Sequence, residues 1–233
     1  HGLAAMTILA LIPARGGSKG VPRKNLRMVG DRSLLVRAID ACLGVQQIER
    51  VFVSTDDDGI RKAALAAGAD VPTLRPDGLA TDDAPTLPVI RHAIELYDSL
   101  GVRATAVVLV EPTSPFRTAE HVAAAVKRYA QGDCASVATV MPMDRKPENI
   151  FRKDGVLRRY IEAPRERFAR RQDMAHLCRI NSAVYVTSRD AVMAGHLLPE
   201  PIGFVEMDER SSINIDTELD LAFADFLART GGI

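Results

Sequence analysis

Residues 8–25 read ILALIPARGGSKGVPRKN, and this stretch sets the fold class. The apolar run from Ile8 to Ile12 predicts a short buried strand. A loop with three glycines follows, and it carries four cations: Arg15, Lys19, Arg23 and Lys24. Glycine allows backbone N–H groups to approach an anion closely and to form turns that other residues cannot adopt. A strand that opens into such a loop predicts a pocket for a polyphosphate.

Two familiar phosphate loops do not match this stretch. The Walker A pattern requires Lys followed by Ser or Thr after its second glycine, whereas here Ser18 precedes Lys19. The dinucleotide pattern G-x-G-x-x-G is absent, because Gly16 and Gly17 are adjacent and Gly20 stands alone. The remaining structural interpretation is a solvated basic turn after an edge strand. Four cations set among glycines and prolines favour an anion-binding loop instead.

The composition limits the class of ligand. The chain has 233 residues, enough for one large domain, and 47% of them are hydrophobic. Lys+Arg and Asp+Glu both number 30, so the net charge is zero. A general nucleic-acid binder is therefore not indicated. The basic loop is a local feature, which favours a small anionic ligand over a polymer.

The cysteines and the apolar runs bear on location. Cys42, Cys134 and Cys178 are far apart and show no metal-binding spacing, so we expect reduced thiols and a cytoplasmic protein. No apolar run approaches the length of a membrane span, and no signal peptide is visible. Residues 1–5, which precede Met6, are expected to be a remnant added for expression.

Strand-like and helix-like segments alternate along the chain. Strands are expected at 7–12, 50–55, 71–74, 105–110, 135–141 and 180–187. Helices are expected at 33–43, 58–67, 86–100, 118–131 and 217–229. This alternation predicts an α/β fold, a three-layer, doubly wound and mostly parallel sheet with helices on both faces. Ligands of such folds bind at the carboxyl ends of strands, where the basic loop leaves the first strand.

The alternation breaks between residues 142 and 179, where charges are dense and apolar residues sparse. We therefore divide the chain into an α/β domain, residues 6–141 and 180–233, and an inserted excursion at 142–179. A functional excursion, an oligomer contact and a disordered insert are all compatible with this composition. Val156, Tyr160 and Ile161, behind the turn at Asp154-Gly155, predict a hairpin within it.

Three polar clusters follow predicted strands, at 54–58, 75–82 and 111–117. The acids of the first cluster suit either ligand binding or the capping of the next helix. The second suits either a turn that wraps a base or ribose with backbone groups, or a plain surface loop. In the third, two prolines hold a polar segment extended, which is typical of a substrate wall.

A fourth cluster, at 213–220, is expected to end a strand and open the last helix. In an extended segment Asn214 and Asp216 point the same way. Asp216 is a candidate ligand for Mg²⁺, which accepts one or two carboxylates plus phosphate oxygens and waters. Its alternative role is to cap the last helix, for which Thr217 competes.

The sequence resembles the CMP-acylneuraminate cytidylyltransferases, the CMP-sialic acid synthetases. The first block is residues 12–25, IPARGGSKGVPRKN, and six similar blocks follow in family order: 54–56, 75–82, 112–117, 171–173, 181–185 and 213–220. The resemblance implies a Rossmann-like fold of the nucleotide-diphospho-sugar transferase type. It also implies transfer of CMP from CTP to the anomeric hydroxyl of a 2-keto-3-deoxy sugar acid, with release of pyrophosphate, for surface glycan biosynthesis.

The resemblance also implies residue roles. Charge neutralisation and catalysis would fall to Arg15, Lys24 and Asp216. Nucleotide binding would fall to Ala14, Gly16, Gly17, Ser18, Lys19, Asn25, Arg75, Leu79, Ala80 and Thr86. Sugar binding would fall to Glu111, Arg117, Lys146, Arg165, Arg171, Asn181 and Tyr185. Mg²⁺ (or Mn²⁺) would be held by Asp216 with Asn214. A homodimer is expected, with the excursion closing the neighbour's site.

Two departures from the family pattern stand out. Position 214 is Asn where the sialic acid enzymes carry a second Asp, so the expected metal site loses one charge. Position 111 is Glu where they usually carry Gln, and a carboxylate only accepts hydrogen bonds. We therefore expect a sialic-acid-like sugar, deaminated and diamino forms included. The alternatives are a related nucleotidyltransferase with another acceptor or nucleotide, and a non-catalytic nucleotide-binding protein.

Overall fold

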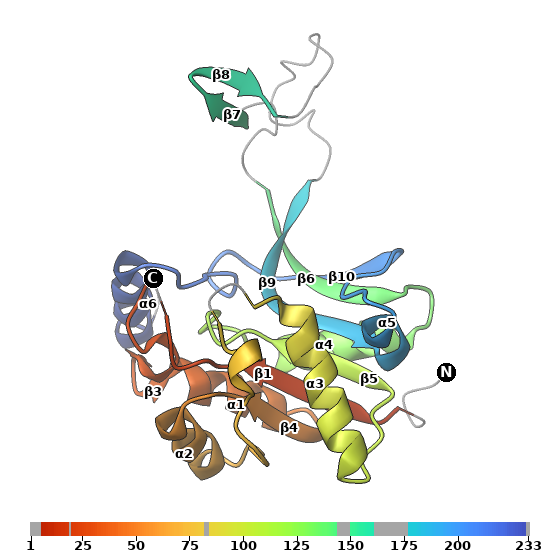
Figure 1. Ribbon diagram of the computed structural model, residues 1–233. Helices are drawn as coiled ribbons and strands as arrows, with labels where there is room; N and C mark the ends of the chain where they lie inside the picture. The colour runs from red at the N-terminus through yellow and green to blue at the C-terminus, as the bar shows by residue number, and fades with distance from the viewer. Residues whose placement is uncertain (1–5, 19, 82–83, 144–149, 161–176, 232–233) are drawn as a thin grey trace.

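The computed structural model describes residues 6–18, 20–81, 84–143, 150–160 and 177–231, and within them one central sheet has six strands (Figure 1). The strands, in spatial order, are β10 (Ile202–Glu206), β6 (Ser136–Pro142), β9 (Cys178–Ser188), β5 (Ala106–Val110), β1 (Ile8–Pro13) and β4 (Ile48–Ser54). Neighbouring strands pair in parallel except β9, which runs antiparallel to β5 and β6. The expected mostly parallel α/β sheet is confirmed.

Helices cover both faces of the sheet. They are α1 (Leu34–Leu43), α2 (Asp58–Ala66), α3 (Thr86–Ser99), α4 (Ala119–Ala130), α5 (Arg189–Met193) and α6 (Glu218–Arg229). Alternate residues of β1 face opposite layers, as the period of a strand requires. Ala10 and Ile12 pack with residues of α1, α2 and α4, whereas Leu9 and Leu11 pack with residues of α3 and α5. The protein therefore has the three layers that the sequence predicted.

Shorter elements complete the described residues. The 3-10 helices are η2 (Lys24–Leu26) and η3 (Asp77–Leu79), and one small hairpin joins β2 (Met28–Val29) to β3 (Arg32–Ser33). None of the described helices has the length and apolar character needed to cross a membrane.

The helices begin and end at residues whose side chains or backbone suit a helix end. Ser33 Oγ accepts a hydrogen bond of 3.3 Å from the backbone N–H of Val36, which satisfies one free donor at the start of α1. Thr217 caps α6, since its Oγ1 accepts from the N–H of Asp220 at 3.2 Å. Gly68, after α2, has φ +89, a left-handed conformation that glycine adopts without steric cost. These predicted boundaries are confirmed.

Two predicted strands are wrong. Residues 71–74 do not form a strand, and the sheet receives only an isolated bridge between Asp70 and Phe52. Pro72 lies in that segment and has no N–H to donate to a ladder. The segment before α6 is also not a strand. This segment is instead joined to the segment that follows β5, where the N–H of Ile215 donates to the carbonyl of Thr113 at 2.9 Å.

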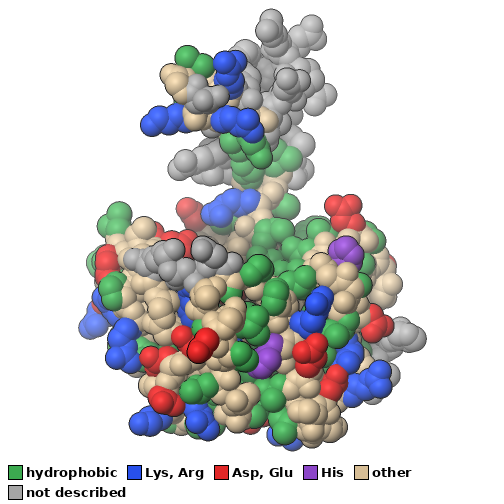
Figure 2. All heavy atoms as spheres, viewed as in Figure 1, with side chains coloured by type: hydrophobic (Ala, Val, Ile, Leu, Met, Phe, Trp, Pro, Cys, Tyr) green, Lys and Arg blue, Asp and Glu red, His purple; other side chains and the backbone are tan. Residues whose placement is uncertain are grey.

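The predicted hairpin in the excursion is confirmed. Strands β7 (Phe151–Asp154) and β8 (Val156–Arg159) pair antiparallel around Gly155, which has φ +66. They stand away from the central sheet in Figure 1. The hairpin exposes apolar side chains, with Leu157 68% accessible, and Figure 2 shows its basic side chains at the surface. Lys146, Ile161, Arg165 and Arg171 lie outside the described residues.

Candidate active site

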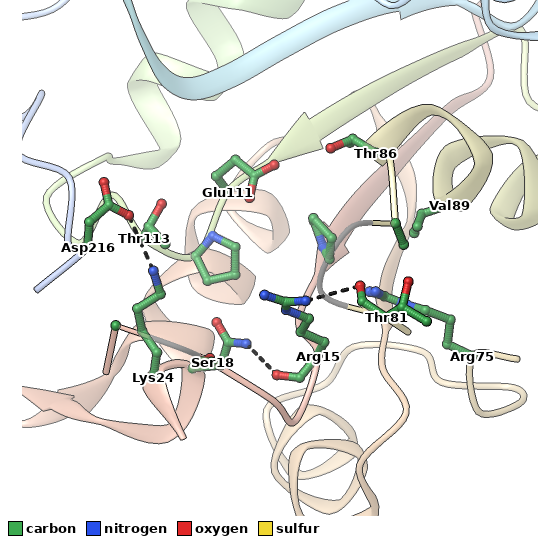
Figure 3. Close-up of a pocket in the computed structure, with 15 residues that line it drawn as sticks. Arg15, Ser18, Lys24, Arg75, Thr81, Thr86, Val89, Glu111, Thr113 and Asp216 are labelled. Atoms are coloured by element: carbon green, nitrogen blue, oxygen red, sulfur yellow. Dashed lines mark hydrogen bonds and ion pairs between the residues drawn. The ribbon is translucent and has the colours of Figure 1, made fainter. Parts of the chain in front are cut away.

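A cavity of about 400 Å³ opens where β1 and β5 end (Figure 3). This is the sheet edge at which α/β proteins bind ligands. The predicted site residues that line it are Arg15, Ser18, Lys24, Asn25, Arg75, Thr86, Glu111 and Asp216. The structure therefore brings the basic loop together with residues of the second, third and fourth predicted polar clusters, at 75–82, 111–117 and 213–220.

Hydrogen bonds to neighbouring polar groups hold the backbone of the basic loop in place. Asp56 Oδ1 accepts the N–H of Gly16 at 2.8 Å. Asn25 is buried, and its Nδ2 donates to the carbonyl of Arg15 at 3.0 Å. Arg15 Nη1 donates to the carbonyl of Thr81 at 3.1 Å and so links the loop to the segment before α3. These contacts fix the backbone of the loop before any ligand binds.

The acidic cluster at 54–58 therefore has mainly a structural role. Asp57 Oδ1 accepts the N–H of Ile60 at 2.8 Å and caps α2, which confirms the capping interpretation for that residue. Asp56 does not cap the helix; its carboxylate accepts a hydrogen bond from the glycine-rich loop and holds the loop in place. A Cβ at Gly16 would lie 2.9 Å from the Cβ of Asp57, so only glycine fits between loop and cluster without displacement.

Lys24 and Asp216 bring distant parts of the chain together. Lys24 Nζ donates to the carbonyl of Ile215 at 2.9 Å and lies 3.4 Å from Asp216 Oδ1. A Cβ at Gly20 would lie only 2.2 Å from the carbonyl oxygen of Asp216, so the backbones of the two segments touch. Because Thr217 caps α6, the Asp216 carboxylate is left to face Lys24 across the cavity rim.

Asn214 and Asp216 form the candidate metal-binding pair. Asn214 Nδ2 donates to Asp216 Oδ2 at 2.6 Å, so the two side chains meet as their spacing predicted. The amide oxygen of Asn214 is buried and makes no hydrogen bond with the described residues. The described residues contain no group of three or more His, Cys, Asp or Glu placed for a metal. A carboxylate and an amide oxygen nevertheless suit Mg²⁺ when phosphate oxygens and water supply the other ligands.

Arg75 supports the far end of the cavity. Its side chain is buried, and its Nε donates to Ser54 Oγ at 2.9 Å and its Nη2 to the carbonyl of Ser54 at 2.5 Å. Nη1 donates to the carbonyl of Leu79 at 3.4 Å. Burial lowers the pKa of Arg75, and the charge of Asp56 opposes that shift. Arg75 thus fixes the turn that contains Leu79 and Ala80.

Thr86 lies beside this turn as the first residue of α3 and points into the cavity in Figure 3. Seven lining residues were not predicted individually: Pro13, Gly20, Thr81, Ala84, Val89, Pro112 and Thr113. Thr81 and Thr113 fall within the predicted polar clusters, so a signal for them existed. Val89 lies one helical turn after Thr86, and an apolar residue in a helix gives no signal of a binding role.

Glu111 enters the cavity from the end of β5. Its backbone N–H donates to the carbonyl of Ala183 at 3.3 Å, and its carbonyl accepts from Arg117 Nη1 at 2.8 Å. The carboxylate points into the cavity in Figure 3. Burial raises the pKa of Glu111 from 4.5 to about 7, while the charges of Arg117, Lys24 and Arg75 lower it. A carboxyl group that titrates near neutral pH is typical of functional sites.

Two predicted sugar-binding residues lie in the protein core instead of the cavity lining. Arg117 is 3% exposed and donates to the carbonyls of Glu111 and Ser114. Asn181 is also buried, and it bonds Thr139, Ser212 and the N–H of Ala183. Each side chain holds backbone or side-chain groups of the protein. The structure places both as positioning residues, because Arg117 Nη1 and the Asn181 amide bond the chain itself, while Arg117 Nε and Nη2 are buried without a partner among the described residues.

The remaining predicted residues have other surroundings. Tyr185 is not among the lining residues, and burial raises the pKa of its hydroxyl, which bonds Ser182. Ala14 is buried and ties β1 to β4 through its N–H and the carbonyl of Ser54 at 2.9 Å. Gly17 has open space around it. Lys19, like the excursion residues named above, lies outside the described residues.

Comparison with known proteins identifies the family. A family model described as Cytidylyltransferase matches residues 9–218. This chain belongs to the cytidylyltransferase family. Members of that family are nucleotidyltransferases, and the chain is accordingly an enzyme of that type. The match runs from β1 to the first residue of α6 and so includes every described residue that lines the cavity.

Relatives within the cytidylyltransferase family act on several sugar acids. The chain is 32% identical to the N-acylneuraminate cytidylyltransferase of Escherichia coli over 93% of the chain and 51% of that protein. It thus spans about half the length of that relative. It is 31% identical to the CMP-N,N'-diacetyllegionaminic acid synthase of Legionella pneumophila, over 95% of the chain and 96% of the relative. The pseudaminic acid cytidylyltransferase of Campylobacter jejuni is 27% identical over 95% of the chain and 96% of the relative.

Solved structures of other cytidylyltransferases share the fold. A CMP:2-keto-3-deoxy-manno-octonic acid synthetase, solved with CTP, matches with a TM-score of 0.72 at 17% identity. The match covers 97% of the present chain and 99% of the synthetase. A 4-diphosphocytidyl-2C-methyl-D-erythritol synthase from Anaerococcus prevotii matches with a TM-score of 0.65 at 16% identity, over 96% and 99%. At this level of identity the likeness shows the fold alone.

Proposed function

We propose that this cytidylyltransferase transfers CMP from CTP to the anomeric hydroxyl of a nonulosonic, sialic-acid-like 2-keto-3-deoxy sugar acid, for surface glycan biosynthesis. The observation that carries the proposal is the contact of the glycine-rich loop with Asp216 through Lys24 and Gly20. This contact supports a cradle for the triphosphate of CTP beside a carboxylate that can meet a metal ion. The names of the N-acylneuraminate, legionaminic and pseudaminic acid relatives support the acceptor class.

The reaction needs alignment and charge neutralisation more than covalent catalysis. The anomeric oxygen of the sugar attacks the α-phosphorus of CTP in line, and the bond from that phosphorus to pyrophosphate breaks. Negative charge develops on the phosphoryl oxygens and on the leaving group. Arg15 and Lys24 line the cavity and would face that charge, with Ser18 and the N–H groups of the loop as further donors. Positioned cations of this kind are worth several kcal/mol in catalysis, on the order of 3 kcal/mol each.

Mg²⁺ (or Mn²⁺) is the cofactor that we propose, held by Asp216 with Asn214. When bound, a divalent ion neutralises phosphate charge and stabilises the pyrophosphate leaving group. Asp216 is the residue suited to orient it, since its carboxylate is 69% exposed and reaches the rim of the cavity. Asn214 contributes an uncharged oxygen, so we infer a lower affinity than a pair of carboxylates would provide.

The opposite end of the cavity suits the nucleoside. Arg75 holds the turn at 77–80 in place, and Thr81, Thr86 and Val89 complete that wall. A cytosine base requires donors and acceptors at fixed positions, which a rigid turn of backbone groups provides. Thr86 offers a hydroxyl near the place where a ribose would lie between base and phosphates.

The acceptor sugar is proposed to meet Glu111 and, from the excursion, Lys146, Arg165 and Arg171. Basic residues suit the carboxylate of a sugar acid. The hairpin exposes Val156, Leu157 and Tyr160, each more than half accessible, next to basic side chains. Apolar groups presented in this way suit burial against another protein surface. We therefore propose a homodimer in which the hairpin covers a second copy, in the cytoplasm, where the free thiols of the three cysteines persist.

A pyrophosphate-release assay tests the proposal. The protein is incubated with Mg²⁺, one nucleotide (CTP, UTP, GTP or ATP) and one acceptor from a panel of sugar acids that includes sialic, deaminated and diamino nonulosonic acids and an eight-carbon ulosonic acid. We expect release with CTP and a nonulosonic acid, and loss of release when EDTA removes the metal. Release only with another nucleotide or acceptor indicates a related nucleotidyltransferase. CTP binding that Mg²⁺ does not strengthen, without release, indicates a non-catalytic protein.

A further inference from the structure

Glu111 is a carboxylate inside the cavity that the protein itself does not pair. Its backbone is fixed by Ala183 and Arg117, but its side chain makes no hydrogen bond or ion pair with the described residues. Two cations of the same cavity are engaged elsewhere, since Arg75 bonds Ser54 and Lys24 bonds Ile215. A partly buried carboxylate without a partner loses hydration and gains no hydrogen bond in return. Its hydrogen-bonding capacity is therefore available to a ligand.

The position of Glu111 indicates which ligand that is. In Figure 3 the side chain lies between two groups of residues, Lys24 with Asp216 on one side and Thr86 with Arg75 on the other. If the triphosphate occupies the first side and the nucleoside the second, Glu111 faces the middle, where the acceptor sugar must approach the α-phosphorus. The inference that follows thus rests on the proposed function.

We propose that Glu111 is a specificity-determining residue that selects acceptor sugars presenting a hydrogen-bond donor, a hydroxyl or an ammonium group, and rejects those presenting a carbonyl oxygen at the same place. An ionised carboxylate has no proton to donate and repels the partial negative charge of an amide oxygen. The preferred substrates are accordingly deaminated or free-amino nonulosonic acids, and N-acyl sugars whose carbonyl faces Glu111 are disfavoured.

The selection is reversible by pH. Once protonated, Glu111 both donates and accepts hydrogen bonds, which makes it equivalent to glutamine. Arg117, Lys24 and Arg75 favour its ionised form. On β9, burial and, to a smaller extent, the charge of Glu111 raise the pKa of the Tyr185 hydroxyl. Arg15 and Asp216 line the same cavity as Glu111. Burial is the larger influence and moves the transition to about 7, so selectivity is expected to relax between pH 8 and pH 6.

A pair of acceptors differing in one group tests this inference. Values of kcat/KM are measured at pH 8 and pH 6 for N-acetylneuraminate, for its deaminated analogue with a hydroxyl at that carbon, and for its free-amino analogue. Loss of one hydrogen bond to a charged group costs about tenfold to a hundredfold. The native enzyme is therefore expected to prefer the hydroxyl or amino sugar by at least about tenfold at pH 8, and by less than about threefold at pH 6.

Glu111→Gln keeps the shape of the side chain and removes its titration. This variant is expected to show a preference for the hydroxyl or amino sugar below about threefold at both pH values, through changes in KM for the sugar rather than for CTP. Glu95→Gln, the same change on an exposed face of α3, is the matched control and should behave as the native enzyme. Thermal unfolding verifies that both variants are folded.

The outcomes separate this inference from the function on which it rests. Absence of pyrophosphate release by the native enzyme with every nonulosonic acid overturns both. Normal release with equal selectivity in native and Glu111→Gln enzymes, or selectivity that pH leaves unchanged, overturns only the role of Glu111. A fall in kcat for all sugars alike in the variant also overturns it, because that result indicates a general role in catalysis instead of selection.

Discussion

Gly20→Ala tests the contact on which the active site depends. The added Cβ would lie 2.2 Å from the carbonyl oxygen of Asp216, whereas ordinary contacts begin near 3.4 Å. Loop and segment must therefore separate by about 1 Å, since neither contacting atom belongs to a flexible side chain, and a misplacement of about 1 Å in a site costs about a hundredfold in rate. Overpacking of this kind costs about 1–3 kcal/mol of stability.

Pyrophosphate release and urea unfolding measure the two effects of Gly20→Ala. Gly17→Ala is the control for unfolding, because nothing lies within 4 Å of a Cβ built at Gly17. We expect the free energy of unfolding of this control to change by less than about 0.5 kcal/mol. A Gly20→Ala protein with native activity and stability would refute the inference that the loop and Asp216 are held together by backbone contact.

Three further predictions follow from the same contacts. Lys24→Ala and Asp216→Ala should each reduce turnover at least about a hundredfold, since each removes an electrostatic group at the triphosphate; near-native pyrophosphate release by either variant would remove that residue from the catalytic set. The raised pKa of Glu111 means that the native protein is more stable when this carboxyl is protonated, so its free energy of unfolding should fall as pH rises from 4.5 to about 7, by up to about 3 kcal/mol. Urea titrations at pH 5 and pH 8 should show that Glu111→Gln removes this fall, and a fall of equal size in the variant would contradict the assignment. Arg117→Met should destabilise the protein by about 2–4 kcal/mol, because the carbonyls of Glu111 and Ser114 lose their donor; an unchanged urea midpoint would contradict the positioning role.

Local chemistry was enough to predict much of the α/β domain from the sequence. Ser33 and Gly68 mark helix boundaries because a cap and a left-handed glycine act within a few residues of the chain. Segment 71–74 failed as a strand prediction because strand formation depends on partners, and only Asp70 forms a bridge. The antiparallel direction of β9 was also not predictable, since it depends on the path of the excursion between β6 and β9.

The site residues show a similar division. Lys24 and Asp216 were correctly expected to lie together, and their contact joins positions 192 residues apart. Arg117 and Asn181 were expected to bind the sugar because they lie in two of the blocks that resemble the family. In the structure both side chains bond the protein itself. Which choice a polar residue makes depends on carbonyls and hydroxyls that the fold brings near, and these belong to distant parts of the sequence.

Hydrogen bonding then separates residues that shape the site from residues that meet a ligand. Arg75, Asn25 and Arg117 donate to carbonyls and fix three segments of the cavity wall. Because Arg75, Asn25 and the Nη1 of Arg117 already donate to the protein itself, substituting these residues should alter geometry and stability before it alters recognition. Glu111 has the opposite character, since its backbone is fixed and its carboxylate has no partner among the described residues. A substitution there should change which acceptor binds while the fold persists, and differences in acceptor between cytidylyltransferases of this architecture should therefore map to such unpaired positions.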